Sequence, residues 1–180
     1  MKVKHQLSRL EPIVFNSIHA IDRGDWRWAP EGKWSLAQIV EHLAITMDVV
    51  AEEFEQLAGE GGMQRNATPT QSVMRHTLLG AGEFPKGMRA PDVTRPSDDP
   101  DPELAAARFR MAVERTRQLV DQWPERRQLE TFLNHPVIGD LNLPEWVRFH
   151  YVHCSLHARQ IEKWLVWFGD SKQAAGSGEH

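Results

Sequence analysis

The segment at residues 143–168 limits the fold most strongly, because it has the pattern of one long amphipathic helix with histidines in its apolar face. At about 100° per residue, the apolar side chains fall within a sector of roughly 80°, and charged residues occupy the opposite side. Burying an imidazole ring is costly unless the ring finds a hydrogen bond or a metal ion. The sequence must therefore supply partners for the histidines in this sector, which contains Trp146, His150, His153, His157, Ile161, Trp164 and Phe168.

Three other long segments repeat apolar residues with the helical period, and no segment has a convincing strand pattern. Ser35 and Gln38 match a capping box, which predicts where the second of these helices begins, and Asn142 with Glu145 resembles another. Helices of this length favour an all-α fold, a four-helix bundle. A long irregular excursion, residues 59–101, separates the second and third main helices. The first, third and fourth predicted main helices span residues 4–22, 102–123 and 143–168. The second runs from Ser35 to the glycines near residue 59, and a short helix is predicted at residues 70–79.

The chain of 180 residues is predicted to form one helical-bundle domain over 1–168, followed by a flexible polar tail at 169–180. A net charge of −4 and a pI of about 6.1 do not indicate the basic surface that binding to nucleic acid requires, so no nucleic-acid partner is expected. The one cysteine excludes an internal disulfide framework. With neither a signal-peptide pattern nor an apolar run long enough for a membrane span, the expected location is cytoplasmic.

A metal site is one of two ways to satisfy the buried histidines. His153 and His157 are four residues apart, so their rings can converge on one ion. His150 is too far along the same helix to join them and is better placed as a pocket residue. His42, on the second main helix, is a candidate third ligand, although its position on the flank of the apolar stripe allows this role without requiring it. The alternative is a set of hydrogen-bonded core histidines without metal.

Two motifs in order, "WSLAQIVEHL" and much later "HPVIGDLNLPEWVRFHYVHCSLHARQI", resemble the DinB/YfiT-like superfamily of metalloenzymes, closest to an uncharacterised branch. The resemblance implies a four-helix bundle that holds a divalent metal, often zinc or nickel, with three histidines. By position these are His42, His153 and His157. It also implies, for some relatives, a low-molecular-weight thiol such as bacillithiol, mycothiol or glutathione in transfer or isomerisation. Relatives often pair, so a homodimer is a further expectation.

Other polar residues are assigned places around the site without a catalytic role. Glu41 is expected at the surface or beside the ligands, and His135, before a proline, either lines the pocket or holds the turn. Trp146 is a candidate pocket residue, with core packing the simpler interpretation. Cys154 is interpreted as a small buried apolar residue. Lys86, Arg89 and Arg95 could attract a carboxylate-bearing thiol, although solvated loop charges are the commoner case.

These features support two hypotheses of different classes. The first is a metal-dependent enzyme acting on a small molecule by thiol-dependent transfer or by hydrolysis, and it leaves the catalytic residues unknown because no general base is evident. The zinc-protease pattern would place a glutamate directly after His153, where this chain has Cys154. The second is a non-catalytic bundle whose histidine or metal cluster is structural or binds a small ligand.

Overall fold

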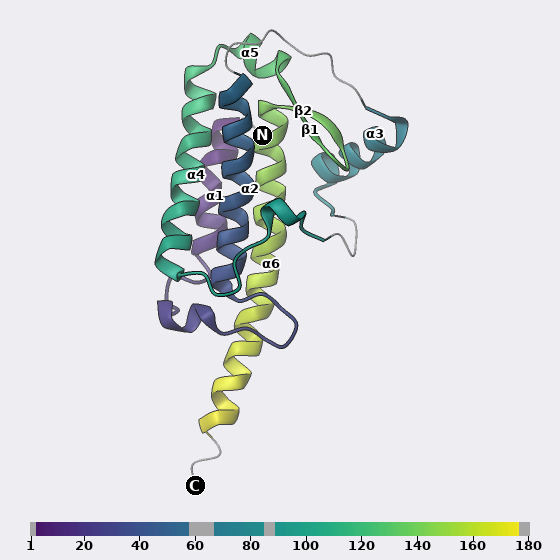
Figure 1. The fold of residues 1–180 in the computed structure, drawn as a ribbon. Coiled ribbons are helices and arrows are strands. Elements are labelled where there is room, and N and C mark those ends of the chain that lie inside the picture. The colour runs from purple at the N-terminus through teal and green to yellow at the C-terminus, as the bar shows by residue number, and fades with distance from the viewer. Residues whose placement is uncertain (1–2, 58–66, 85–88, 177–180) are drawn as a thin grey trace.

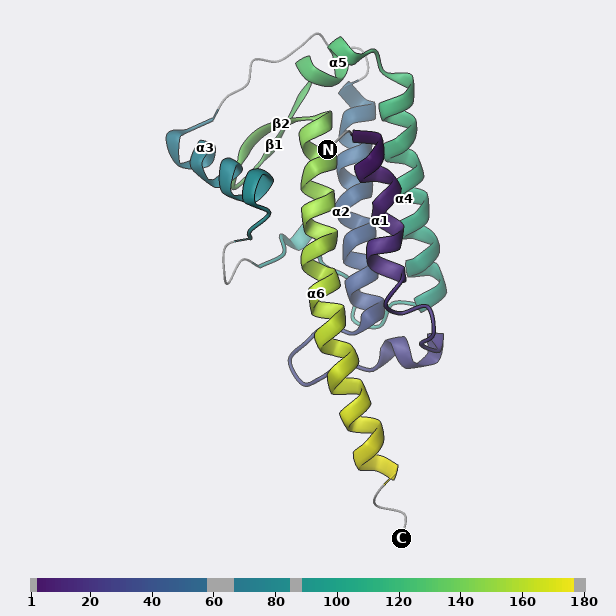
Figure 2. The same cartoon turned by 180° about the vertical axis from the view of Figure 1, so that it is seen from behind.

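The computed structural model describes residues 3–57, 67–84 and 89–176, and Figures 1 and 2 show a bundle of long helices. Helix α2 packs against α4 and α6, and α1 packs against the same two helices, so the four main helices form a closed ring around one core. This arrangement confirms the predicted all-α bundle. The main helices are α1 (Val3–Phe15), α2 (Leu36–Gln56), α4 (Pro102–Gln122) and α6 (Leu143–Gly176).

The predicted capping pairs determine where two of these helices begin. The Ser35 side chain accepts a hydrogen bond from the backbone N–H of Gln38, whose side chain accepts one from the Ser35 N–H. Asn142 and Glu145 exchange the same pair of bonds at the start of α6. Each pair satisfies two backbone donors that a helix end would leave unpaired. These caps fix the register of the two helices that carry the histidines.

The excursion between α2 and α4 contains more helix than loop where the structure describes it. The predicted short helix is present as α3 (Pro69–Arg75), which continues as a π-helical segment, η3 (His76–Ala81). It ends at Gly82, whose φ of 75° suits glycine. A 3-10 turn, η4 (Asp92–Thr94), then lies against α2. Residues 58–66 and 85–88, which include Lys86, lie outside the described residues.

Three parts of the chain differ from the prediction. Helix α1 ends at Phe15 instead of continuing to residue 22, because three-residue turn bonds from Ile18 N–H to the Phe15 carbonyl and from Ile21 N–H to the Ile18 carbonyl replace the helical pattern there. A 3-10 helix, η1 (Arg23–Arg27), begins after these turns. The connector before α6 contains a short helix, α5 (Glu125–Glu130), and an unpredicted hairpin of β1 (Phe132–His135) with β2 (Gly139–Asn142). Strands of four residues are too short to show a periodic pattern.

The third difference lies at the C-terminus, where α6 continues to Gly176 instead of ending at Phe168. The predicted flexible tail is therefore helical over residues 169–176. The Ser171 hydroxyl donates to the Phe168 carbonyl oxygen, and Lys172 forms an ion pair with Asp25 of η1 at 3.2 Å. These contacts hold the added turns, and Figures 1 and 2 show α6 extending past the other main helices.

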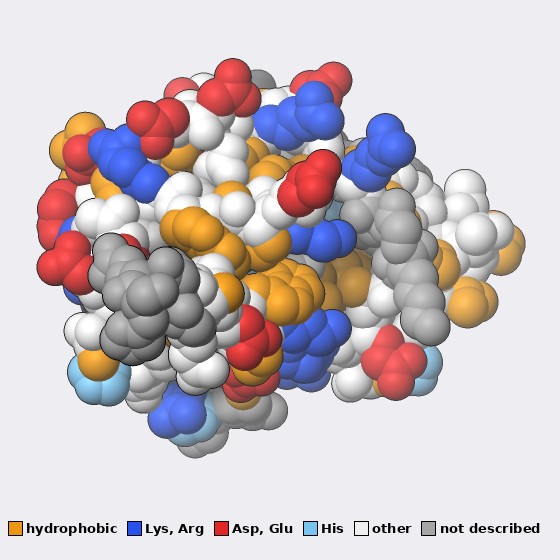
Figure 3. All heavy atoms as spheres, turned by 90° about the horizontal axis from the view of Figure 1, so that it is seen from below, with side chains coloured by type: hydrophobic (Ala, Val, Ile, Leu, Met, Phe, Trp, Pro, Cys, Tyr) orange, Lys and Arg blue, Asp and Glu red, His pale blue; other side chains and the backbone are white. Residues whose placement is uncertain are grey.

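The outer surface of the bundle carries charges of both signs. Figure 3, which views the molecule from below, shows acidic and basic side chains interspersed with apolar ones. Within the part of the chain that the structure describes, every helix is too short or too polar to serve as a membrane-spanning segment.

Candidate metal centre

His42 of α2 and His153 and His157 of α6 meet in the interior of the bundle. Their exposed fractions are 4%, 8% and 5%, so all three rings are shielded from solvent. The Nε2 atom of His153 lies 3.2 Å from Nε2 of His42 and 3.1 Å from Nε2 of His157. One ring nitrogen of each histidine lies within 4.8 Å of the other two. The structure thus brings together the three residues named as ligands and could hold a metal ion among them.

The spacing of these nitrogens matches a tetrahedral ion. Zinc binds histidine nitrogen at about 2.0–2.1 Å, so two nitrogens on a tetrahedral ion lie about 3.3 Å apart. The two Nε2–Nε2 distances of 3.2 and 3.1 Å are close to this value. Three protein ligands also leave a fourth position open, as catalytic zinc sites do.

Hydrogen bonds alone satisfy this cluster poorly. Nδ1 of His42 lies 2.6 Å from the carbonyl oxygen of Thr94, which can only accept, so His42 carries its proton on Nδ1 and directs a lone pair from Nε2 into the cluster. His153 Nε2 then faces two neighbouring ring nitrogens and has at most one proton to offer. Two linear hydrogen bonds cannot form from that proton. One cation would satisfy all three lone pairs.

The bond from His42 to Thr94 also orients the ring, because a partner on one imidazole nitrogen fixes the direction of the other. Helix α2 holds the Thr94 segment in place. The Glu41 carboxylate accepts bonds from the backbone N–H and the hydroxyl of Ser97 at 2.7 and 2.8 Å. The Gln38 side chain donates to the carbonyl oxygens of Ser97 and Asp98. Glu41 is thus bonded to Ser97, three residues after the Thr94 whose carbonyl contacts His42.

Aromatic rings surround the three histidines. The Trp34 ring lies 4.9 Å from that of His42 and is nearly parallel to that of His157, with centroids 6.3 Å apart. On the other side, Phe84 and Phe149 lie 5.6 and 5.4 Å from the His153 ring. None of these three residues was predicted to belong to the site.

The sequence positions of two of the three aromatic residues could have indicated that they lie near the histidines. Trp34 directly precedes the capping serine of α2, and Phe149 lies one helical turn before His153. Phe84 belongs to the excursion, which has no periodic pattern, so its position could not be predicted from the sequence.

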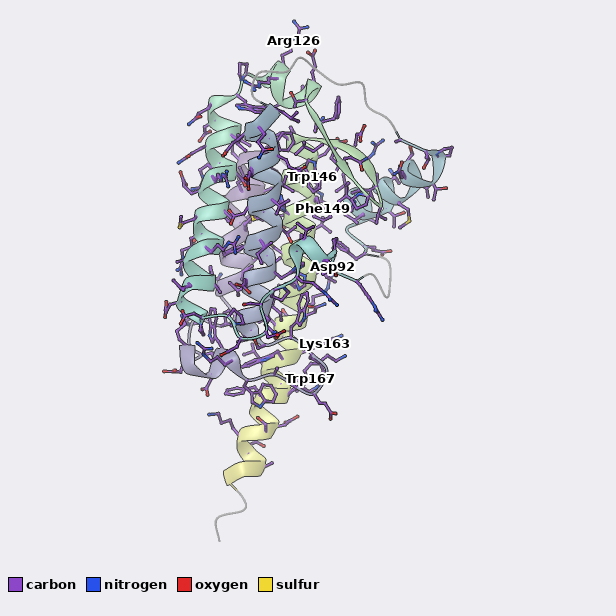
Figure 4. The ribbon with its side chains drawn as sticks, in the orientation of Figure 1. Asp92, Arg126, Trp146, Phe149, Lys163 and Trp167 are labelled. Carbon is purple, nitrogen blue, oxygen red and sulfur yellow. The ribbon has the colours of Figure 1, made fainter. Side chains whose placement is uncertain are left out.

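His150, His135 and Trp146 form a separate cluster farther toward the start of α6. The rings of Trp146 and His150 lie 6.0 Å apart, and those of His135 and Trp146 lie 5.5 Å apart. His135 Nδ1 accepts the backbone N–H of Val137 at 3.1 Å, which stabilises the turn, while its ring contacts Phe149. Figure 4 shows Trp146 and Phe149 on α6 beside the hairpin. Phe149 separates this cluster from His153.

Burial keeps the site histidines neutral. Desolvation lowers the pKa of His42 against the opposing effect of the Thr94 bond, and it lowers the pKa of His157 to about 3. Desolvation, reinforced by the neighbouring His157 and His42, holds the pKa of His153 well below its ordinary value. A neutral imidazole is the form that binds metal.

Cys154 and the basic residues of the excursion were also weighed as functional groups. Cys154 is 1% exposed, and burial raises the pKa of its thiol, which fits a small apolar role and opposes reactivity. Arg95 is exposed and lies 3.5 Å from Asp92, and Arg89 is also exposed.

We expect acid to destabilise the metal-free protein through His150. Burial lowers the pKa of His150 to about 3, and both ring nitrogens are buried with no hydrogen-bond partner among the described residues. Unfolding restores an ordinary pKa near 6.5, so the unfolded chain takes up a proton that the folded chain does not. The stability gained from a neutral His150 is complete above pH 6.5 and falls as the pH approaches 3. The slope approaches about 1.4 kcal/mol per pH unit.

Urea unfolding of wild type and His150→Gln between pH 7.5 and 4.5 measures this contribution. The variant should lose less stability on acidification than wild type. His19→Gln, which changes an exposed histidine, should retain the wild-type slope. Equal slopes for wild type and His150→Gln would contradict the burial argument.

Comparison with known proteins gives one family. Comparisons with curated proteins and with solved structures gave no match. The family model described as the DinB superfamily matches residues 6–161, a range that contains all three clustered histidines. The match covers most of the chain and agrees with the helical bundle observed. The chain therefore belongs to the DinB superfamily.

Proposed function

We propose that His42, His153 and His157 bind one divalent metal ion, zinc or nickel, and that the protein is a metal-dependent enzyme. The observation that carries this proposal is the convergence of three buried ring nitrogens from two helices, with one ring oriented by the Thr94 carbonyl. Imidazole ligands suit zinc and nickel, whereas magnesium and calcium prefer oxygen. The set contains no carboxylate among the described residues.

The reaction we propose is transfer of a low-molecular-weight thiol to an electrophilic small molecule. A divalent ion bound by three imidazoles acidifies a water or thiol at its open position and so supplies a nucleophile near neutral pH. Cys154 is buried and its thiol resists ionisation, so the sulfur would come from a co-substrate. Hydrolysis of a small molecule is the second reaction of this class.

The protein's own residues would orient the reactants. Trp34, Phe84 and Phe149 provide aromatic surface beside the three rings, which suits the apolar part of a small substrate. Thr94 would keep the proton of His42 on Nδ1, so that Nε2 remains a ligand. The homodimer expected from the resemblance stays a prediction.

One observation favours a structural role as the alternative. The bond from His42 to Thr94 joins α2 to the excursion, so an ion on the other nitrogen of the same ring would tie α2, α6 and the excursion together. Structural zinc sites have four protein ligands, whereas this group has three among the described residues. The ligand number therefore favours the enzyme.

Removing one ligand should remove both metal and activity. We expect wild type to contain about one zinc or nickel per chain and to transfer glutathione or bacillithiol to an aryl halide such as 1-chloro-2,4-dinitrobenzene. His42→Ala should lose the metal and reduce kcat/KM by about 100-fold or more, because the ion supplies several kcal/mol of charge stabilisation. Elemental analysis and a spectrophotometric assay measure the two effects.

The matched control is His19→Ala, because His19 is exposed and remote from the cluster in sequence. It should keep the metal content and the rate of wild type. Metal binding without turnover for any thiol or hydrolysable ester would favour the structural role. Turnover that survives in metal-free His42→Ala would refute the proposed site.

A second prediction concerns Glu41, which holds Ser97 and through it the Thr94 segment. Glu41→Ala should lower zinc affinity by about tenfold, the lower end of the effect seen when a partner of a metal ligand is removed. Glu53→Ala changes an exposed glutamate on the same helix and should leave affinity unchanged. Competition with a zinc-binding dye gives both values. Equal affinities for the two variants would mean that the excursion does not orient His42.

A further inference from the structure

A cleft lies apart from the three clustered histidines, where the excursion meets the starts of α1 and α6. Its volume is about 750 Å³, within the range typical of small-molecule sites. Helix α3 and η3 form one wall, and the first turns of α1 and α6 form the other. Its polar lining consists of Gln6, Ser72, Arg75, His76, Glu145 and Arg148.

Arg75 carries a buried polar atom without a partner. Its Nη1 is shielded from solvent and makes no hydrogen bond to any described residue. A buried donor on a charged group costs free energy unless it meets an acceptor, so such an atom needs an explanation. An acceptor bound in the cleft would supply one.

Arg148 presents a second guanidinium to the same cleft. Its Nε donates to the carbonyl oxygen of Leu79 at 2.8 Å, which ties α6 to η3 and fixes the plane of the group. A guanidinium has five N–H bonds, and the only hydrogen bond of this group to a described residue is the one from Nε. A planar guanidinium with free terminal donors matches the geometry of carboxylate and phosphate oxygens.

Glu145, the acidic residue among the described lining of the cleft, also caps α6. The Glu145 carboxylate accepts the backbone N–H of Asn142 at 3.0 Å as part of the α6 cap. Two guanidinium groups therefore face one carboxylate that is already hydrogen-bonded. The side chain of Gln6, which is 4% exposed, adds an uncharged amide to the wall. Among the described lining residues, the two arginines and one glutamate give a positive balance that favours an anion.

We propose that this cleft binds a small molecule through an anionic oxygen group, a carboxylate or a phosphate, held between Arg75 and Arg148. The site is separate from the metal centre, because Arg148 lies about 140° around α6 from His153 by helical geometry. Arg75 belongs to α3, which Figures 1 and 2 place outside the ring of main helices. The anion would link the excursion to the helix that carries two of the metal ligands.

Isothermal titration with inorganic phosphate and with succinate, at constant ionic strength, tests the proposal and separates the two anion classes. We expect saturable binding of at least one of them to wild type and a loss of at least tenfold in affinity for Arg75→Gln. Ser72→Glu, which places a negative charge in the same wall, should weaken binding similarly. Arg117→Gln removes a charge from α4, on the opposite side of the bundle from α3, and should bind as wild type does (Figure 1).

His42→Ala should retain the binding, which distinguishes this cleft from the metal centre. The thermal stability of Arg75→Gln should equal or exceed that of wild type, because the substitution removes an unpaired buried group. Absence of saturable binding for both anions, or an equal loss in Arg75→Gln and Arg117→Gln, would overturn the proposal. Loss of binding in His42→Ala would assign the anion to the metal instead and overturn it as well.

Discussion

The convergence of three imidazole rings between α2 and α6 is the constraint on which the site depends. Neutral rings packed nitrogen to nitrogen cannot all form linear hydrogen bonds, and the Thr94 carbonyl has already committed the one proton of His42. All three rings are shielded from bulk solvent, so few solvent molecules can complete their hydrogen bonds. A cation at the point where the lone pairs meet resolves the conflict, and the bundle holds the rings at the spacing that such an ion requires.

The excursion between α2 and α4 contacts one of the three rings, because its Thr94 carbonyl bonds His42. Gln38, Glu41 and His42 lie within two turns of α2, and each bonds to the segment from Thr94 to Asp98. One face of one helix thus supplies a metal ligand and anchors the backbone that orients it. A long connection inside a compact domain is often functional. Here its function would be to set the direction of His42 and, at its other end, to form a wall of the anion cleft.

Much of this arrangement could be predicted from the sequence, because helices carry a periodic signal. The capping pairs marked the starts of α2 and α6, and the spacing of His153 and His157 placed both rings on one face. Spacing alone left His42 undecided, and the family resemblance selected it. The excursion has no period, so the contacts of Thr94 and Phe84 could not be foreseen.

The errors have local physical causes. Strands of four residues gave too little pattern to reveal the hairpin, and the apolar period of α1 continues in the sequence through Ile18 and Ile21, where the chain forms turns. The glycine and polar residues after Phe168 suggested a helix end, but α6 continues to Gly176, with contacts from Ser171 and Lys172 along the added turns. None of these errors affects the positions of the three ligands, because the core of the bundle fixes them.

X-ray absorption spectroscopy at the edge of the metal that the purified protein carries, or of added zinc, tests the central claim most directly. The structure predicts three imidazole nitrogens at about 2.0–2.1 Å for zinc, with at least one further light-atom ligand. Two or fewer imidazoles, or a sulfur ligand at about 2.3 Å, would contradict the claim that His42, His153 and His157 share one ion.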